Sequence, residues 1–268
     1  MKDNWMIQKK AIKTKLKNAV LIVGLPGIGN VGKITADFLV DDLKAIEVFK
    51  ISSSYFPHSV FISDESILEM PTVYLHIVKS GAKSNQDIIL LSGDIQPMDE
   101  QASYKFCDKI LDLAQELGCT EIITVGGIGL PGEPKKPTVY GVATSKATKA
   151  AWSKISKAVH FKDNKAATIV GATGLMLGLG TYRKIEGISL LAETVGHPYH
   201  LGLKEATEVL KILEKKLKLK INLNKIRKEI KKTEIEHSEQ AKESHENVLM
   251  KKLKRFSGET QVDTSYIG

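Results

Sequence analysis

The sequence has few cysteines and no long apolar run, and each absence argues against a class of protein. Cys107 and Cys119 are the two cysteines among 268 residues, and they show no Cys-x-x-Cys or Cys/His spacing. This argues against a disulfide framework and against a zinc site. No apolar run approaches the roughly 18–20 residues of a membrane-spanning helix. Near the N-terminus the apolar residues are scattered among lysines, without a signal-peptide core, so we expect a soluble, cytoplasmic protein.

Acidic residues are fewer than basic ones, but the excess positive charge is confined to the two ends of the chain. The formal net charge is +8, whereas residues 18–210 carry a net charge of −3. Residues 1–17 carry +5 and residues 211–255 carry +8. The basic stretches 211–232 and 251–255 contain no aromatic residue, so they lack the stacking surface that RNA-binding and single-strand-binding proteins use. We therefore expect no specific nucleic-acid partner.

Short apolar runs alternate with amphipathic helical stretches between residues 19 and 210. The apolar runs predict strands at 19–23, 45–51, 72–77, 87–91, 121–125, 167–170 and 188–192. Helices are predicted at 33–43, 99–117 and 204–219. Several runs are apolar on consecutive residues, which is typical of strands buried on both faces. This succession predicts an α/β domain with a largely parallel sheet and helices on both faces.

The composition divides the chain into four expected segments. They are a basic N-terminal extension (1–18), the α/β domain (19–221), a charged helical arm (222–256) and a flexible C-terminal tail (257–268). Residues 225–256 contain no glycine or proline. At about 1.5 Å per residue, a helix over these residues would extend about 48 Å.

Glycines end several of the predicted strands, at Gly24, Gly93, Gly126-Gly127 and Gly171. Turns at the carboxyl ends of parallel strands gather at one edge of a sheet, where α/β folds usually bind ligands. Tight turns without any ligand account for the same pattern, and this is the interpretation we favour.

The segment Gly-Ile-Gly-Asn-Val-Gly at residues 27–32 fits the dinucleotide-binding pattern G-x-G-x-x-G. That pattern also requires an acidic residue about 20 positions later, and residues 51–54 contain none. A phosphate-binding loop requires Ser or Thr after its lysine, but Ile34 follows Lys33. We therefore favour a tight strand-to-helix turn. A nucleotide- or phosphate-binding enzyme that uses the loop from Gly24 to Gly32 remains the alternative.

No catalytic group can be assembled from the remaining candidates. His197 and His200 follow Glu193 closely and could support acid–base chemistry, although His-Pro-Tyr-His is also an ordinary polar turn. Asp94 and Asp99 flank the end of one strand, but Asp99 is better explained as an acid that complements the dipole of the next helix. We expect no enzymatic activity, no cofactor and no metal site.

Six blocks of sequence occur in a fixed order along the chain. They read GLPGIGNVG at 24–32, SGDIQP at 92–97, VGG at 125–127, PTVYGVAT at 137–144, IVGATGLML at 169–177 and LLAET at 190–194. In these blocks the chain resembles the proteasome assembly chaperone 2 family, in its archaeal form, over about residues 19–225. The resemblance implies a three-layer α/β/α domain, similar in architecture to nucleoside phosphorylases but without their catalytic residues.

The resemblance also implies a function. Family members help α-type subunits of the 20S proteasome assemble, some archaeal relatives activate the finished core without ATP, and many are homo-oligomers. In such partners a C-terminal hydrophobic–Tyr–any tripeptide enters pockets between α subunits. This chain ends in Tyr266, Ile267 and Gly268, so its tyrosine is third from the end instead of second, and it follows Ser265. We expect a non-enzymatic chaperone or adaptor of the proteasome core that binds α subunits through Tyr266, Ile267 and Gly268.

Overall fold

The computed structural model describes residues 4–10, 16–63, 65–80, 86–161, 168–197, 200–226 and 228. The chain divides into two compact units, Met1–Leu223 and Asn224–Gly268, and the elements named below belong to the first. The predicted tail and all but the first residues of the predicted arm lie outside the described residues.

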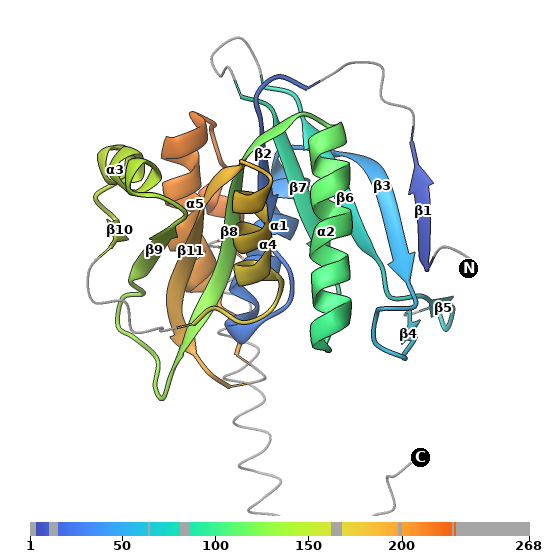
Figure 1. Cartoon of the computed structure of the whole chain (residues 1–268). Helices are drawn as coiled ribbons and strands as arrows, with labels where there is room; N and C mark the ends of the chain where they lie inside the picture. Colours follow the sequence, from blue (N-terminus) through green and yellow to red (C-terminus); the bar gives the residue numbers. More distant parts are fainter. Residues whose placement is uncertain are drawn as a thin grey trace, which may run out of the picture. The chain divides into compact units, whose positions relative to one another are not determined.

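A nine-stranded sheet forms the centre of the first unit (Figure 1). Its strand order is β1-β3-β6-β7-β2-β8-β11-β9-β10. The four central strands β7, β2, β8 and β11 are parallel, whereas β1, β3 and β6 pair antiparallel on one side and β9 is antiparallel to β11 on the other. The bounds are β1 Trp5–Lys9, β2 Ala19–Val23, β3 Ile46–Ser53, β6 Val73–Val78, β7 Ile88–Gly93, β8 Cys119–Leu130, β9 Val139–Ala143, β10 Val159–His160 and β11 Glu186–Val195. A separate two-stranded hairpin consists of β4 (Phe61–Ile62) and β5 (Leu68–Glu69).

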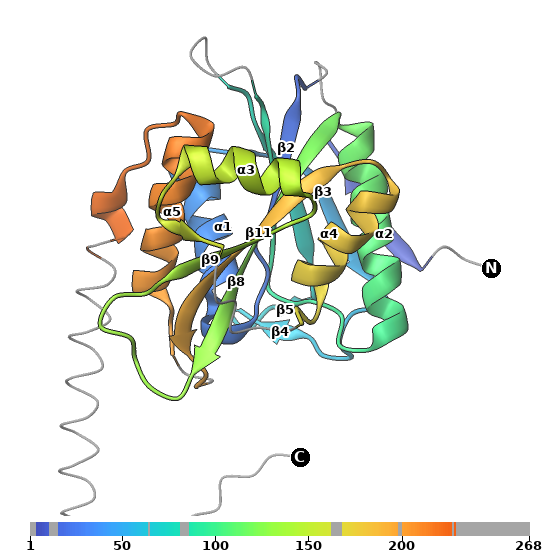
Figure 2. The ribbon, with the colours of Figure 1, turned by 60° about the vertical axis from the view of Figure 1, so that its left-hand side comes forward.

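Helices cover both faces of this sheet, as predicted. On one face α1 (Val31–Asp42) packs beside α5 (Leu203–Leu217), and on the other α2 (Glu100–Glu116) packs beside α4 (Ala172–Tyr182). The short helix α3 (Lys146–Ile155) lies near β9 and β11, and a 3-10 turn η1 (Ile28–Asn30) precedes α1. Figure 2 shows the two helical layers on either side of the strands. The predicted α/β class is confirmed, with the parallel part of the sheet at its centre. Among the described helices, none combines the length and the apolar character needed to cross a membrane.

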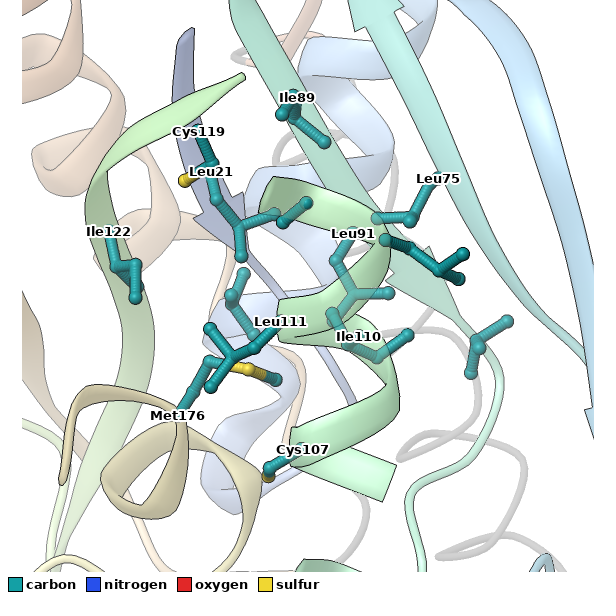
Figure 3. Packing of buried hydrophobic residues seen from close by; sticks show 14 of the residues in the cluster. Leu21, Leu75, Ile89, Leu91, Cys107, Ile110, Leu111, Cys119, Ile122 and Met176 are labelled. Atoms are coloured by element: carbon teal, nitrogen blue, oxygen red, sulfur yellow. The ribbon is translucent and has the colours of Figure 1, made fainter. Parts of the chain in front are cut away.

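Every residue of β2 and β7 is buried, which explains their uninterrupted apolar sequences. On the face covered by α2 and α4, Leu21 and Leu91 of the strands lie in one buried cluster with Ile110 and Leu111 of α2 and Met176 of α4 (Figure 3). The apolar residues of α2 recur every three or four positions, so one stripe of the helix faces the sheet. Periodicity thus assigns the core residues of β2, β7 and α2 to buried faces.

The predicted strand at 167–170 is wrong. Its described residues, 168–170, form an irregular segment that leads into α4. Val170 is 88% exposed, and Gly171 has a left-handed backbone with φ of 81°. This apolar run lies on the surface and does not enter the sheet. A run this short does not distinguish a buried strand from a surface segment by its sequence alone.

The prediction that Gly126 and Gly127 end a strand is also wrong, because β8 continues through them to Leu130. A Cβ atom added to Gly127 would overlap the carbonyl oxygen of Ile28 in the loop before α1. These glycines allow another part of the backbone to approach the strand closely.

Several elements of the first unit were not predicted, among them β1, β9, α3 and α4. Strand β1 lies in the segment that we expected to be an extension, and it pairs antiparallel with β3. Helix α4 contains no charged residue and includes Gly174, Gly178 and Gly180, so it shows no amphipathic period. Helix α3 begins after Ser145, a residue type that is common at the N-cap of helices. Its hydroxyl accepts a hydrogen bond from the Thr148 backbone N–H at 3.1 Å.

The buried environment of His76 on β6 makes the stability of the domain depend on pH. Burial lowers its pKa below the ordinary 6.5, which outweighs the opposing charges of Glu47 and Asp37, while Lys10 adds to the lowering. Its Nδ1 atom is buried without a hydrogen-bond partner in the described structure. The unfolded chain therefore binds a proton more readily than the folded one, so stability should fall as the pH drops from about 6.5 through the lowered pKa.

We expect a His76→Gln variant to lose less unfolding free energy than the wild type between pH 7 and pH 5. Urea unfolding at both pH values measures this difference. A His58→Gln variant is the control, because His58 is exposed, and it should keep the wild-type pH dependence. If the unfolding free energy changed equally with pH in the wild type and in His76→Gln, the result would contradict a lowered pKa of His76.

Candidate functional site

The glycine-rich loop between β2 and α1 is held at both ends by backbone hydrogen bonds. The Gly24 N–H donates to the Leu91 carbonyl at 3.0 Å, and the Gly202 N–H donates to the Gly29 carbonyl at 2.7 Å. Gly29 and Asn30 have left-handed backbones, with φ of 62° and 50°. Such a conformation suits glycine and asparagine better than other residues. The sequence of the loop is therefore matched to a sharp change of direction before α1 begins.

The other glycines of this loop allow close packing against the domain. A Cβ atom on Gly24 would overlap the carbonyl oxygen of Gly32 and lie 2.5 Å from the Cβ of Ala36. A Cβ atom on Gly32 would lie 2.5 Å from the carbonyl oxygen of Val125 in β8. The space that a dinucleotide-binding loop would offer to phosphate is here filled by protein backbone at these two positions. This geometry supports the tight strand-to-helix turn.

A cavity of about 320 Å³ lies beside the loop, at the carboxyl edge of the parallel strands. Its described walls come from the loop, the second half of β8 and the segment before α4, and all of these described lining side chains are uncharged. The side chain of Gln96 connects two of these walls: its amide donates to the Pro26 carbonyl at 2.7 Å and its oxygen accepts from the Ala172 N–H at 3.3 Å. Because none of the described lining residues is ionisable, they offer neither an acid–base pair nor a cation for phosphate.

Lys33 stands where a phosphate-binding loop has its lysine, but it does not line this cavity. Its ammonium group lies 2.8 Å from a carboxylate oxygen of Asp37 and 2.8 Å from one of Asp94. Burial lowers the pKa of Lys33, but the hydrogen bonds and charges of these two carboxylates outweigh burial and raise it. The lysine is thus held as a cation between two acids.

Two of the remaining catalytic candidates, His200 and Glu193, contact different partners in the described structure. His200 Nε2 lies 3.0 Å from an oxygen of Glu205, whereas Glu193 accepts a hydrogen bond from the Tyr140 hydroxyl at 3.2 Å. We expected Asp99 in the first turn of α2, but it lies one residue before the helix, and its carboxylate caps α2 by accepting from the Ala102 N–H at 2.8 Å. Within the described residues, no group of three or more His, Cys, Asp or Glu side chains is placed to hold a metal ion.

Both cysteines are buried in the domain core. Burial raises the pKa of the Cys107 thiol to about 12 and that of the Cys119 thiol to about 11. Since the thiolate is the nucleophile, these protonated side chains are unreactive at neutral pH. Their role in the domain is packing.

Large apolar side chains are exposed on the β4–β5 hairpin and around α4. The six on the hairpin are Val60, Phe61, Ile62, Ile67, Leu68 and Met70. Around α4 they are Tyr104, Val170 and Tyr182. Contiguous exposed apolar surface is typical of protein–protein contacts. Neither surface can be recognised from the sequence, because the sequence does not show which apolar residues the core leaves out.

Comparison with known proteins identifies the family of this domain. Residues 21–241 match the sequence profile of the PAC2 family. An uncharacterised protein of Methanocaldococcus jannaschii is 30% identical in an alignment of 257 residues that covers 94% of this chain and 93% of that protein.

Two solved structures from Pyrococcus furiosus are similar to the whole domain. PbaB, an archaeal proteasome activator, has a TM-score of 0.82 at 32% identity, over 89% of this chain and 99% of PbaB. PbaA, an archaeal homologue of proteasome-assembly chaperone, has a TM-score of 0.71 at 21% identity, over 94% of this chain and 98% of PbaA, which shows the shared fold. This chain belongs to the PAC2 family, and the resemblance found in its sequence blocks is confirmed. The predicted contact residues Tyr266, Ile267 and Gly268 lie outside the described residues.

Proposed function

We propose that this protein is a non-enzymatic chaperone or adaptor of the 20S proteasome core that binds its α subunits. The observation that carries the proposal is the likeness to PbaB, an archaeal proteasome activator, at 32% identity over 99% of that chain. The match of residues 21–241 to the PAC2 family supports it. We further propose that it acts in the cytoplasm as a homo-oligomer and needs no cofactor.

The site geometry is consistent with a binding role. None of the described residues that line the cavity at the carboxyl edge is ionisable, and Gly24 and Gly32 of the loop pack closely against backbone atoms of the domain. Exposed apolar side chains on the hairpin and around α4 provide surface of the kind that protein partners cover. These features favour an adaptor over the nucleotide-binding alternative.

We propose that Tyr266, Ile267 and Gly268 dock into pockets between α subunits. An aromatic side chain followed by a free carboxylate is suited to capture of a chain terminus by backbone donors and a cationic side chain. Several such tails on one oligomer would bind a symmetric ring by avidity, so that no single contact has to be tight.

The experiment is a native-gel and light-scattering binding assay with the cognate 20S core and with isolated α subunits. We expect the full-length protein to bind, and a version lacking Tyr266, Ile267 and Gly268 to bind at least tenfold more weakly because the avidity of the tails is lost. A Thr264→Ala variant is the matched control and should bind like the wild type. Peptide hydrolysis by the core then separates an activator from a chaperone that acts only during assembly.

Each outcome decides a different part of the proposal. Binding that survives the truncation would contradict docking by the tail and would move the contact to the rest of the chain. If the full-length protein binds neither the core nor the α subunits, the proteasome proposal is wrong. Stabilisation of the domain by ATP or NAD would then test the loop from Gly24 to Gly32 as a nucleotide site.

A further inference from the structure

Contacts with two other loops hold the side-chain amide of Gln96, which lies between β7 and α2. Its Nε2 atom donates to the Pro26 carbonyl in the loop after β2 at 2.7 Å, and its Oε1 atom accepts from the Ala172 N–H at the start of α4 at 3.3 Å. If nitrogen and oxygen were exchanged, two acceptors would meet at Pro26 and two donors at Ala172, so these partners fix the orientation of the amide. A Cβ atom on Gly171 would lie 2.9 Å from Oε1, and the glycine there leaves room for this contact.

The amide of Gln96 keeps half of its hydrogen-bonding capacity. A primary amide carries two N–H donors, and its oxygen has two lone pairs. The bonds to Pro26 and Ala172 use one donor and one lone pair, so one of each remains in the described structure. Gln96 also lines the cavity of about 320 Å³ at the carboxyl edge of the sheet. A donor and an acceptor that are adjacent on one ligand can therefore bond to both remaining groups.

The described wall around this amide is mostly apolar. It includes the side chains of Leu25, Val125, Ile169 and Leu191, and the glycines at 126, 127 and 129 carry no side chain into the cavity. A charged ligand would lose its hydration here without gaining a partner of opposite charge among the described lining residues. An apolar cavity of about 150 Å³ holds a benzene ring, so the present volume has room for two fused rings. Cavities of this size that combine apolar walls with a few fixed polar groups are typical of small-molecule sites.

We propose that this cavity binds a small, uncharged, planar ring compound that carries an amide edge, meaning a ring N–H beside a C=O. The ring packs on the apolar wall and on the glycine backbone of β8. Its N–H donates to Oε1 of Gln96, and its C=O accepts from Nε2. The site differs from the nucleotide-binding alternative because it needs no phosphate, and Lys33 stays paired with Asp37 and Asp94. This binding activity goes beyond the proposed function and does not depend on it.

Quinolinone, a bicyclic lactam whose ring N–H and C=O are adjacent, is the probe. Isothermal titration calorimetry with the full-length protein measures its affinity, and amide NMR spectra locate it. We expect binding that shifts the backbone amides of Gly126, Gly129 and Ala172 and the side-chain amide of Gln96. N-methylquinolinone keeps the rings and the carbonyl but lacks the N–H. It should bind at least about tenfold more weakly, because Oε1 would then face a methyl group instead of a donor.

A Gln96→Met variant removes both hydrogen-bonding groups and keeps a side chain of similar length. It should bind the two lactams with affinities within about twofold of each other, since no group at this position then distinguishes N–H from N-methyl. Gln101→Met is the matched control, because Gln101 is exposed on α2 and is not among the described lining residues. It should keep the tenfold preference. Circular dichroism and urea unfolding check that Gln96→Met folds, and if it does not, the comparison of the two lactams on the wild type still decides.

Four results would overturn the proposal. They are no binding of quinolinone up to its solubility limit, NMR shifts confined to residues away from the cavity, equal affinities of the two lactams for the wild type, and a folded Gln96→Met variant that keeps the preference. None of these measurements uses the proteasome. Failure of the ligand site therefore leaves the proposed function standing, and failure of proteasome binding leaves the ligand site standing.

Discussion

A Gly24→Ala variant should unfold with a free energy lower than that of the wild type by about 3 kcal/mol or more. The added methyl group would overlap the carbonyl oxygen of Gly32 and lie 2.5 Å from the Cβ of Ala36, both within α1. Relief of this overlap requires α1 to move away from β2, which would open the packing between the sheet and that helix. Urea unfolding followed by circular dichroism measures the difference.

Gly27→Ala in the same loop is the matched control. No atom lies within 4 Å of its Cβ position, and its backbone is extended with φ of −175°, which any residue adopts. We expect its unfolding free energy to stay within about 0.5 kcal/mol of the wild type, as for substitutions away from packed features. If Gly24→Ala also kept wild-type stability, the loop would be loosely packed, and the nucleotide-binding alternative would gain support.

A Phe106→Ala variant should lose about 4 kcal/mol of unfolding free energy. Phe106 of α2 is fully buried, and its ring lies 5.9 Å from that of Phe56 in an edge-to-face arrangement. Removing it creates a cavity in the middle of the packing between α2 and the sheet, where the surrounding strands cannot collapse. Chemical unfolding at neutral pH gives the value, and for a domain of this size the midpoint temperature should fall by roughly 8–16 °C.

Phe61→Ala on the β4–β5 hairpin controls for the substitution itself. Phe61 is among the exposed apolar residues, so its loss should cost less than about 1 kcal/mol. A loss of similar size for both variants would contradict the distinction between a packed helix and an uncovered hairpin. A small loss for Phe106→Ala would mean that the α2 layer is not part of the core.

Much of the domain could be predicted from local patterns. The consecutive apolar residues of β2 and β7 identified strands buried on both faces, and the three-or-four-residue period of α2 identified its buried stripe. Asp99 marked the start of α2 because its carboxylate is placed to accept from the first turn of the helix. These signals work because they depend on neighbours that are close in the sequence.

Other parts of the domain could not be predicted, because their structure depends on contacts with residues that are distant in the sequence. Residues 168–170 are as apolar as a strand, but they lie at the surface beside a cavity. Gly126 and Gly127 look like a strand end, but β8 continues through them because it pairs with the distant strand β11 as far as Leu130. Helix α4 contains no charged residue, so its sequence shows no alternation of apolar and polar faces that would predict a helix.

The sequence by itself determined the α/β class, the position of the main strands and helices, and the family, because apolar periodicity and the ordered glycine-rich blocks are properties of neighbouring residues. The tertiary structure decided which glycines have other atoms packed at their Cβ positions, and which acids pair with Lys33. It also decided which apolar side chains remain exposed on the β4–β5 hairpin and around α4. Each of these depends on contacts between segments distant in the chain. The energy of such contacts is set by shape and distance, which residue order does not contain.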